Sequence, residues 1–406
     1  MTPLVWSVGF AGAALLFLAL AELGARWCIR LRARYYVWPP GARYDIRLSP
    51  DLSPPLEARV RFDVNRDGER GSDVRGADRG LYRILVAGGS PVESFLSDQA
   101  TSWHGALERA LATPESLRTL RAARVHVGNI GRSGVAAQEL DLIFERVLPR
   151  YRRLDAILVM VGGNDVFHWL ERGAPSPYPA APVPVRRFFA CHPEGPFTWR
   201  PAQWALVELT RRLRRRWLRP LEVWERAGEW IAEARAMRAR AAELRSTVPD
   251  PSVMLERFEH HLRRLLQRAC AHARRVLVVR QPWFEKDYTP EEASYFWHGG
   301  MGLPWREAVT VYYSLEVVNR LMGLVDSRVA HVAEELGIEH LDLNPVLVPS
   351  LDNYQDYIHY TPAGSAVVAR AVAGALLRTL PAQPGVTDTP ESGSAEASLT
   401  HVDCNR

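Results

Sequence analysis

The sequence almost lacks lysine. Lys286 is the only lysine, and the other fifty basic residues are arginines, so the net charge of +5 reflects arginine usage. The densest run is RRLRRR at 211–216. It is typical either of a solvated helical face or of a patch that contacts phosphates or lipid headgroups. No nucleic-acid module signature accompanies it, so we expect no nucleic-acid partner.

Cysteine is also scarce, and the sequence has no GxGxxG and no Walker loop. The four cysteines are scattered without CxxC or Cys/His spacing, which argues against a zinc site and a disulfide scaffold. A bridge between Cys191 and Cys270 would require an exported chain. With 47% hydrophobic and 24% charged residues, the composition is that of a globular protein.

Charge is absent from the N-terminal segment. The twenty residues Thr2 to Ala21 carry none and are rich in Leu, Ala, Val and Phe, about the length that crosses a bilayer. Arginines, tryptophans and tyrosines follow, as at a membrane interface. We expect a transmembrane anchor over residues 1–25. The alternatives are a signal peptide ending at Ala19-Leu20-Ala21 and a buried core helix.

Five short apolar runs predict strands that are buried on both faces. They span Leu81 to Ala87, Arg124 to Asn129, Ala156 to Val161, Arg275 to Arg280 and Ile338 to Leu343. Helical patterns separate them, at Trp103 to Leu111, Ala136 to Arg150, a long arginine-rich section ending near Ala273, Val309 to Leu336 and Ala363 to Leu380. This alternation predicts a three-layer α/β/α, doubly wound parallel sheet, with the flavodoxin-like order 2-1-3-4-5.

The segments around this core differ in composition. Residues 26–78 are expected to form an extended lead-in that packs on the main domain at 79–380, and about 166–273 is expected to be a mostly helical insertion. The tryptophans of the insertion favour core or interface packing over a carbohydrate platform; they are Trp204, Trp217, Trp224 and Trp230. The tail at 381–406 has the composition of disorder.

Two distant segments carry the residue types of nucleophilic catalysis. Ser90 follows the first strand in AGGS, with Gly88 and Gly89 permitting a tight turn at the carboxyl edge of the sheet, where ligands bind. Asp356 and His359 lie three residues apart, which allows the carboxylate to orient the imidazole. Each has an ordinary alternative: a helix N-cap for the serine, and a cap and a surface histidine for the pair.

Two further residues follow the second and third strands. Gly134 and Asn164 should lie at the same edge as Ser90, where their N–H groups could join the Ser90 N–H in binding an oxyanion. Taken singly, a turn glycine and an Asx-turn asparagine explain them equally well. Their order on consecutive strands favours the functional interpretation.

The motifs in this order resemble the SGNH, or GDSL-like, hydrolase family. GGND at Asn164, DxxH at Asp356 and His359, and the TPAG that follows are similar to its blocks, although the first block reads GGS where the family usually has GDS. GGS variants resemble membrane-anchored bacterial members. The resemblance implies a nucleophile at Ser90, an Asp356–His359 acid-base pair, and an oxyanion hole of Ser90, Gly134 and Asn164.

The resemblance implies a serine esterase that hydrolyses an O-acyl ester, with acetyl as a candidate acyl group, and with no metal and no organic cofactor. An O-acyltransferase acting on a cell-surface glycan and a non-catalytic scaffold are the alternatives. The expected partners are an ester-bearing small molecule, lipid or glycan, and the membrane. Gln281 and Trp283, after the fourth strand, are candidate substrate contacts, with packing as the alternative. His298 and His104 are expected to be structural.

Two features of the sequence predict opposite orientations in the membrane. Arginines after the span would keep the C-terminal part in the cytoplasm by the positive-inside rule, whereas the family resemblance favours an extracytoplasmic domain.

Overall fold

The computed structural model describes residues 3–32, 34–52, 56–74, 80–152, 154–178, 183–195 and 197–378. The expected disordered tail at 381–406 lies outside these residues.

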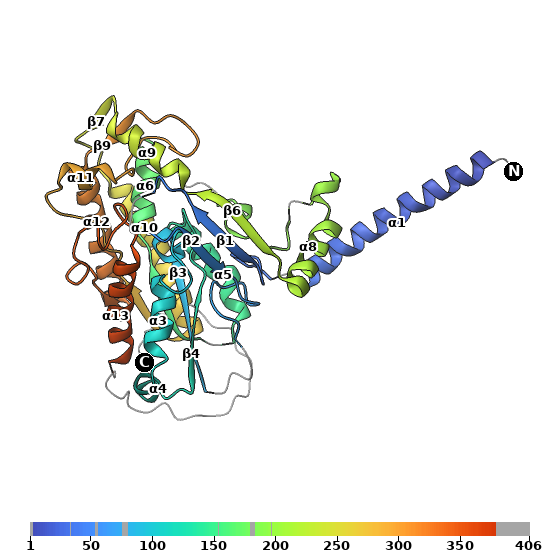
Figure 1. The fold of residues 1–406 in the computed structure, drawn as a ribbon, viewed down its shortest axis with the longest axis horizontal. Helices are drawn as coiled ribbons and strands as arrows, with labels where there is room; N and C mark the ends of the chain where they lie inside the picture. The colour runs from blue at the N-terminus through green and yellow to red at the C-terminus, as the bar shows by residue number, and fades with distance from the viewer. Residues whose placement is uncertain are drawn as a thin grey trace.

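A parallel sheet of five strands forms the centre of the molecule (Figure 1). Its strands are β3 (Leu81–Gly88), β4 (Arg124–Asn129), β5 (Leu154–Met160), β8 (Ala273–Val279) and β10 (Glu339–Leu341). They lie in the order β4-β3-β5-β8-β10, which is 2-1-3-4-5 in chain order. The predicted fold class is therefore confirmed, and the carboxyl ends of these strands open on one edge.

Helices cover both faces of this sheet. On one face α3 (Trp103–Leu111) packs against α13 (Pro362–Leu377); on the other α10 (Ser252–His272) packs between α5 (Ala137–Val147) and α12 (Leu315–Glu335). The shorter helices are α2 (Ser90–Glu93), α4 (Pro114–Thr119), α6 (Gly163–Glu171), α7 (Val185–Phe188), α9 (Glu229–Ala239) and α11 (Pro290–Ser294).

One predicted helix begins later than expected. The run Val309 to Leu336 contains a strand, β9 (Val311–Tyr313), which pairs with β7 (Glu243–Arg245) before α12 begins. Ser314 separates the two elements because its hydroxyl accepts the backbone N–H of Val317 and caps the helix.

A second sheet joins the lead-in to the insertion. Its order is β2-β1-β6, with β1 (Arg43–Leu48) antiparallel to β2 (Arg59–Asp63) and parallel to β6 (Leu221–Ala227). The insertion is expected to be mostly helical, and β6 is a strand in it that the sequence did not predict. The residues of β6 are largely exposed, so its sequence lacks the apolar pattern of a buried strand.

A buried ionic cluster fixes the lead-in to the central sheet. The Glu69 carboxylate is fully buried and accepts hydrogen bonds from Tyr151 Oη (2.6 Å) and Arg83 (3.0 Å), and it lies 2.9 Å from His126 Nε2. Burial disfavours a charged imidazole, but the hydrogen bonds with Glu108 and Glu69 outweigh it and raise the pKa of His126 to about 9. The histidine is therefore charged at neutral pH.

We expect His126→Gln to lower Tm by about 5 °C at pH 6. Because the folded-state pKa exceeds the unfolded value of about 6.5, the charged ring contributes its full stabilisation below pH 6.5 and loses it as the pH rises through 9. Calorimetry from pH 6 to 10 should show the difference between wild type and variant shrinking. His331→Gln, at an exposed position, is the control. A difference independent of pH would contradict the assigned charge.

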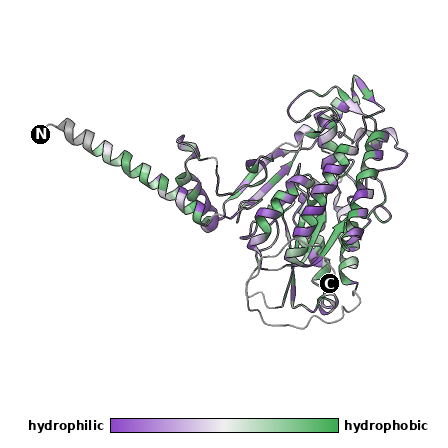
Figure 2. Cartoon of the chain, turned by 180° about the vertical axis from the view of Figure 1, so that it is seen from behind, coloured by the Kyte–Doolittle hydropathy of each residue, from purple (hydrophilic) through white to green (hydrophobic). Residues whose placement is uncertain are grey.

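Helix α1 (Pro3–Arg32) extends away from the rest of the chain, as Figure 1 shows. Figure 2 shows hydrophobic residues along much of its described length. Its segment Phe10–Leu31 is long and apolar enough to cross a membrane, judged by length and composition, and only 17% of its most apolar window is buried. A signal sequence passes the same test, whereas a buried core helix does not fit this exposure.

Candidate active site

Ser90 lies where β3 ends and α2 begins. The two preceding glycines were expected to permit a tight turn, but the structure requires them because neighbouring atoms leave no room for a side chain. A Cβ on Gly88 would lie 2.1 Å from the carbonyl oxygen of Met160. A Cβ on Gly89 would lie 2.4 Å from Asn164 Nδ2. Any side chain at position 89 would thus displace Asn164, which gives a physical reason for GGS in place of GDS in this chain.

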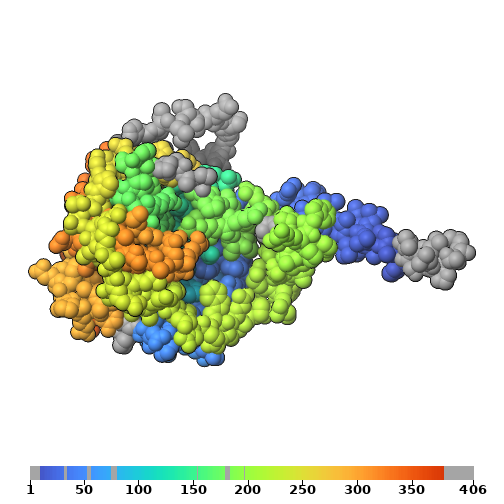
Figure 3. Space-filling view, turned by 90° about the horizontal axis from the view of Figure 1, so that it is seen from above, coloured from blue at the N-terminus to red at the C-terminus, as the bar shows by residue number. Residues whose placement is uncertain are grey.

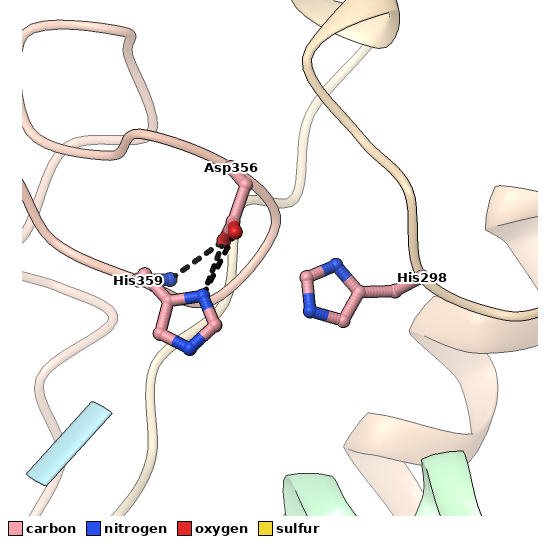
Figure 4. Close-up of side chains that lie close together, drawn as sticks. All are labelled: His298, Asp356 and His359. Carbon is pink, nitrogen blue, oxygen red and sulfur yellow. Dashed lines mark hydrogen bonds and ion pairs between the residues drawn. The ribbon is translucent and has the colours of Figure 1, made fainter. Parts of the chain in front are cut away.

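The loop between β10 and α13 brings two polar side chains to Ser90. His359 Nε2 lies 2.8 Å from Ser90 Oγ, and His359 Nδ1 lies 2.8 Å from Asp356 Oδ2. Figure 4 shows the carboxylate facing the imidazole. Ser90, His359 and Asp356 form one hydrogen-bonded chain, although Ser90 and His359 are 269 residues apart in sequence.

The Asp356 carboxylate is held from several sides. It is almost fully buried and accepts the backbone N–H groups of Ile358 (3.0 Å) and His359 (2.9 Å). The indole Nε1 of Trp297 donates to its Oδ2 at 3.0 Å. Burial raises the pKa of a carboxyl group, but the electrostatic interaction with the His359 ring and these hydrogen bonds prevail and hold the pKa of Asp356 well below its usual range. Asp356 is therefore ionised and fixed in orientation.

Gly134 and Asn164 line the same cavity as Ser90. Gly134 has φ +70°, in the region that favours glycine. Asn164 Nδ2 donates to the carbonyl oxygen of Val135 at 2.9 Å, which fixes the amide and leaves its second N–H for another acceptor. The buried carboxylate of Glu93, at the end of α2, accepts both the backbone N–H and the hydroxyl of Ser133 and so holds the loop before Gly134.

The cavity has a volume of about 600 Å³ and an aromatic wall. Trp230 from α9 meets Trp297 edge to face at 4.9 Å and Trp305 at 5.7 Å between ring centroids. His298 stacks on Trp297 at 3.7 Å. Burial lowers the pKa of His298 to about 3, so this ring is neutral at pH 7. His298, which was expected to be structural, lines the cavity together with Asp356 and His359.

Part of the cavity lining is polar. Arg187 from α7, together with His168 and Glu171 from α6, forms this part next to Gly134. Burial raises the pKa of Glu171 to about 8 and lowers that of His168 to about 4. Near neutral pH, Arg187 therefore contributes a positive charge beside a largely neutral histidine.

Two expected substrate contacts lie elsewhere. Neither Gln281 nor Trp283 is among the described residues that line the cavity. Gln281 Oε1 accepts the backbone N–H of Gly163 at 3.2 Å and so supports the loop that carries Asn164. Trp283 is 7% exposed and belongs to the hydrophobic core. Both side chains turn inward from the end of β8, which favours the packing alternative.

The tryptophans of the insertion do not share one role. The expectation of core or interface packing is wrong for Trp217, which is 78% exposed. Trp224 is 45% exposed but packs against Tyr44 at 5.5 Å and Phe95 at 5.4 Å, as expected for interface packing. Trp230 lines the cavity. No pattern in the sequence predicts this difference, because it depends on where the insertion contacts the main domain.

His298, Asp356 and His359 are also a group whose ligand atoms all lie within 4.8 Å of one another, the spacing that a metal ion would need (Figure 4). Both ring nitrogens of His359, however, already contact Asp356 and Ser90. A metal at this position would have to replace one of these contacts.

Cys191 is a buried free thiol, so the bridge to Cys270 that an exported chain would allow is not formed.

No protein-family model and no curated protein matches the sequence. Similar solved structures include an α/β hydrolase enzyme from the metagenome of Lake Arreo, Spain (13% identity, 73% of this chain and 97% of that chain, TM-score 0.41). Another is an acetylxylan esterase from Geobacillus stearothermophilus (15% identity, 72% of this chain and 92% of that chain, TM-score 0.38). A third is a member of the lipolytic protein G-D-S-L family from Veillonella parvula (10% identity, 74% of this chain and 100% of that chain, TM-score 0.39). The similar structures thus include ester hydrolases and a G-D-S-L protein.

Proposed function

We propose that the chain is a serine esterase of the SGNH type that hydrolyses a small O-acyl ester. The observation that carries this proposal is the chain of contacts from Ser90 Oγ through His359 to the buried Asp356, with 2.8 Å on each side of the imidazole. Gly134 and Asn164 border the same cavity on the next two loops of the sheet edge. A nucleophile, a base, an orienting carboxylate and oxyanion donors are the parts that acyl transfer requires.

In the proposed reaction, Ser90 Oγ attacks the ester carbonyl carbon while His359 Nε2 takes the hydroxyl proton. Asp356 stabilises the imidazolium through Nδ1. The oxyanion accepts N–H groups of Ser90, Gly134 and Asn164. His359 then returns the proton to the leaving alkoxide as the C–O bond breaks. Water attacks the acyl-enzyme in the same way and releases the carboxylic acid.

A second candidate is transfer of the acyl group to a sugar hydroxyl. The aromatic wall of Trp230, Trp297 and Trp305 favours it, because aromatic rings offer flat apolar faces on which an acceptor could lie beside Ser90. In that case the acceptor hydroxyl replaces water in the second step.

Pre-steady-state hydrolysis of p-nitrophenyl acetate tests both candidates. The full chain in detergent should release a burst of p-nitrophenol equal to the enzyme concentration, followed by steady turnover, because an acyl-enzyme forms and is hydrolysed. If steady turnover appears only when an oligosaccharide acceptor is added, the transferase is correct. Absence of both burst and turnover would contradict acyl-enzyme chemistry.

We also propose that α1 anchors the protein as a single membrane span. Its apolar length supports this, and the motif resemblance favours an extracytoplasmic position for the catalytic domain.

A further inference from the structure

A buried carboxylate on α1 joins this helix to α8 (Ala205–Leu218). Glu22 is fully buried, and its carboxylate oxygens accept the backbone N–H groups of Ala205 (2.8 Å) and Leu206 (2.9 Å). It thereby caps the first turn of α8, where unpaired N–H groups and the helix dipole favour a negative charge. Ala25 and Ile29 pack with Ala205 on the following turns. Figure 3 shows the two segments side by side.

The position of this contact along α1 is informative. Glu22 comes directly after the uncharged stretch Thr2 to Ala21, which is about as long as the hydrocarbon core of a bilayer is thick. If that stretch spans the membrane, the N-terminus of α8 is fixed at the depth where α1 leaves the hydrocarbon. Further side chains reinforce the contact: the Arg26 guanidinium lies over the Trp199 ring at 4.9 Å and donates to the carbonyl oxygen of Thr198.

The apolar stripe of α8 continues beyond its contact with α1. Leu206, Leu209, Leu213 and Trp217 follow at intervals of three or four residues and so share one side of the helix. The first two pack against the cluster around Ala25. The last two are 49% and 78% exposed. A bilayer interface would accept such an open apolar end, particularly its tryptophan.

The charges beside this stripe are positive and mostly unpaired. Arg212 and Arg215 contact Glu208 at 2.9 and 3.5 Å. Arg211, Arg214 and Arg216 are exposed, and none forms an ion pair with any residue in the described ranges. Arginines next to exposed tryptophan and leucine are the composition of an amphipathic helix that lies on anionic lipid.

We propose that α8 forms a lipid-binding surface that docks on anionic phospholipid headgroups and holds the catalytic domain at a fixed orientation to the membrane. Leu213 and Trp217 enter the interface, and Arg214 and Arg216, which flank them on the helix, contact phosphates. The proposal rests on the membrane anchor proposed above. It assigns the RRLRRR run to headgroup contact and not to a solvated helical face.

Hydrogen exchange of the full chain in nanodiscs tests this surface. Discs carrying one copy each are prepared from phosphatidylcholine with or without phosphatidylglycerol. We expect the amides of α8 to exchange about tenfold more slowly with the anionic lipid, because each arginine near such a surface adds favourable binding energy. The variant Arg211→Gln/Arg214→Gln/Arg216→Gln should lose this protection. The matched control Arg118→Gln/Arg320→Gln/Arg370→Gln removes exposed charges from α4, α12 and α13 and should keep it.

The outcomes separate the surface from the anchor. Equal exchange of α8 in both lipids, or unchanged protection in the triple α8 variant, would overturn the lipid-binding surface while leaving α1 as an anchor. Protection that appears only when two copies share a disc would assign the open stripe to a second copy of the chain, again overturning the proposal. Failure of the chain to enter discs would overturn the anchor and this surface together, but not the esterase.

Discussion

Ser90→Ala should reduce kcat/KM for p-nitrophenyl acetate by roughly 10⁴-fold to 10⁶-fold. The substitution removes the only atom that could form the acyl-enzyme in the proposed reaction, while the remaining donors near Gly134 and Asn164 still polarise the carbonyl. The fold should tolerate it, because alanine fits the first position of α2 and, within the described residues, the Ser90 hydroxyl forms a hydrogen bond with His359 alone. Steady-state kinetics and Tm of the purified full chain measure both effects.

Ser294→Ala is the matched control, since it deletes a hydroxyl at the exposed end of α11, outside the cavity. Its kcat/KM should equal that of the wild type. If Ser90→Ala retains more than about a tenth of the wild-type activity, another nucleophile or a directly activated water carries the reaction.

Asp356→Asn should reduce kcat by about 10⁴-fold, with little change in Tm. The asparagine oxygen, in the place of Oδ1, can still accept the backbone N–H groups of Ile358 and His359, so the loop keeps its shape. The NH₂ in the place of Oδ2 can no longer accept the indole N–H of Trp297. The amide cannot offset the charge of the imidazolium, and its NH₂ favours the His359 tautomer that leaves Nε2 protonated and unable to accept the Ser90 proton.

Asp352→Asn makes the same change at an exposed position of the same loop and should leave kcat unaltered. If kcat of Asp356→Asn reaches that of the wild type at high pH, the charge and orientation of this carboxylate are not needed for the reaction. The cap of α13 is Thr361, whose hydroxyl accepts the backbone N–H of Gly364, so a loss below tenfold at pH 7 would argue that Asp356 only holds its own loop through the N–H groups of Ile358 and His359.

The central sheet was predictable because its strands are buried on both faces. The ends of β3, β5 and β8 are continuously buried, so their sequences are apolar throughout and distinct from the helices between them. Strand β6 was not predictable: its residues are exposed, and its pairing with β1 depends on a contact between segments more than a hundred residues apart. The start of α12 was missed because β9 is equally apolar.

The residues near Ser90 were predictable to the extent that each follows a strand of the sheet. The parallel arrangement alone brings Gly134, Asn164 and the loop of Asp356 to one edge. The surrounding groups have no such rule. Trp297 reaches Asp356 from an irregular loop, and Gln281, at the end of β8, turns toward the backbone of Gly163 and away from the cavity. Side-chain direction at a strand end is set by packing that the sequence does not display.

Covalent labelling with a fluorophosphonate tests the central claim most directly, because the reagent requires an activated serine next to a general base and oxyanion donors. The full chain should gain the mass of one adduct, peptide mapping should place it on Ser90, and Asp356→Asn should react far more slowly. An adduct on another serine, or no adduct on protein that is folded and catalytically active, would contradict the assignment of Ser90, His359 and Asp356 as the reacting group.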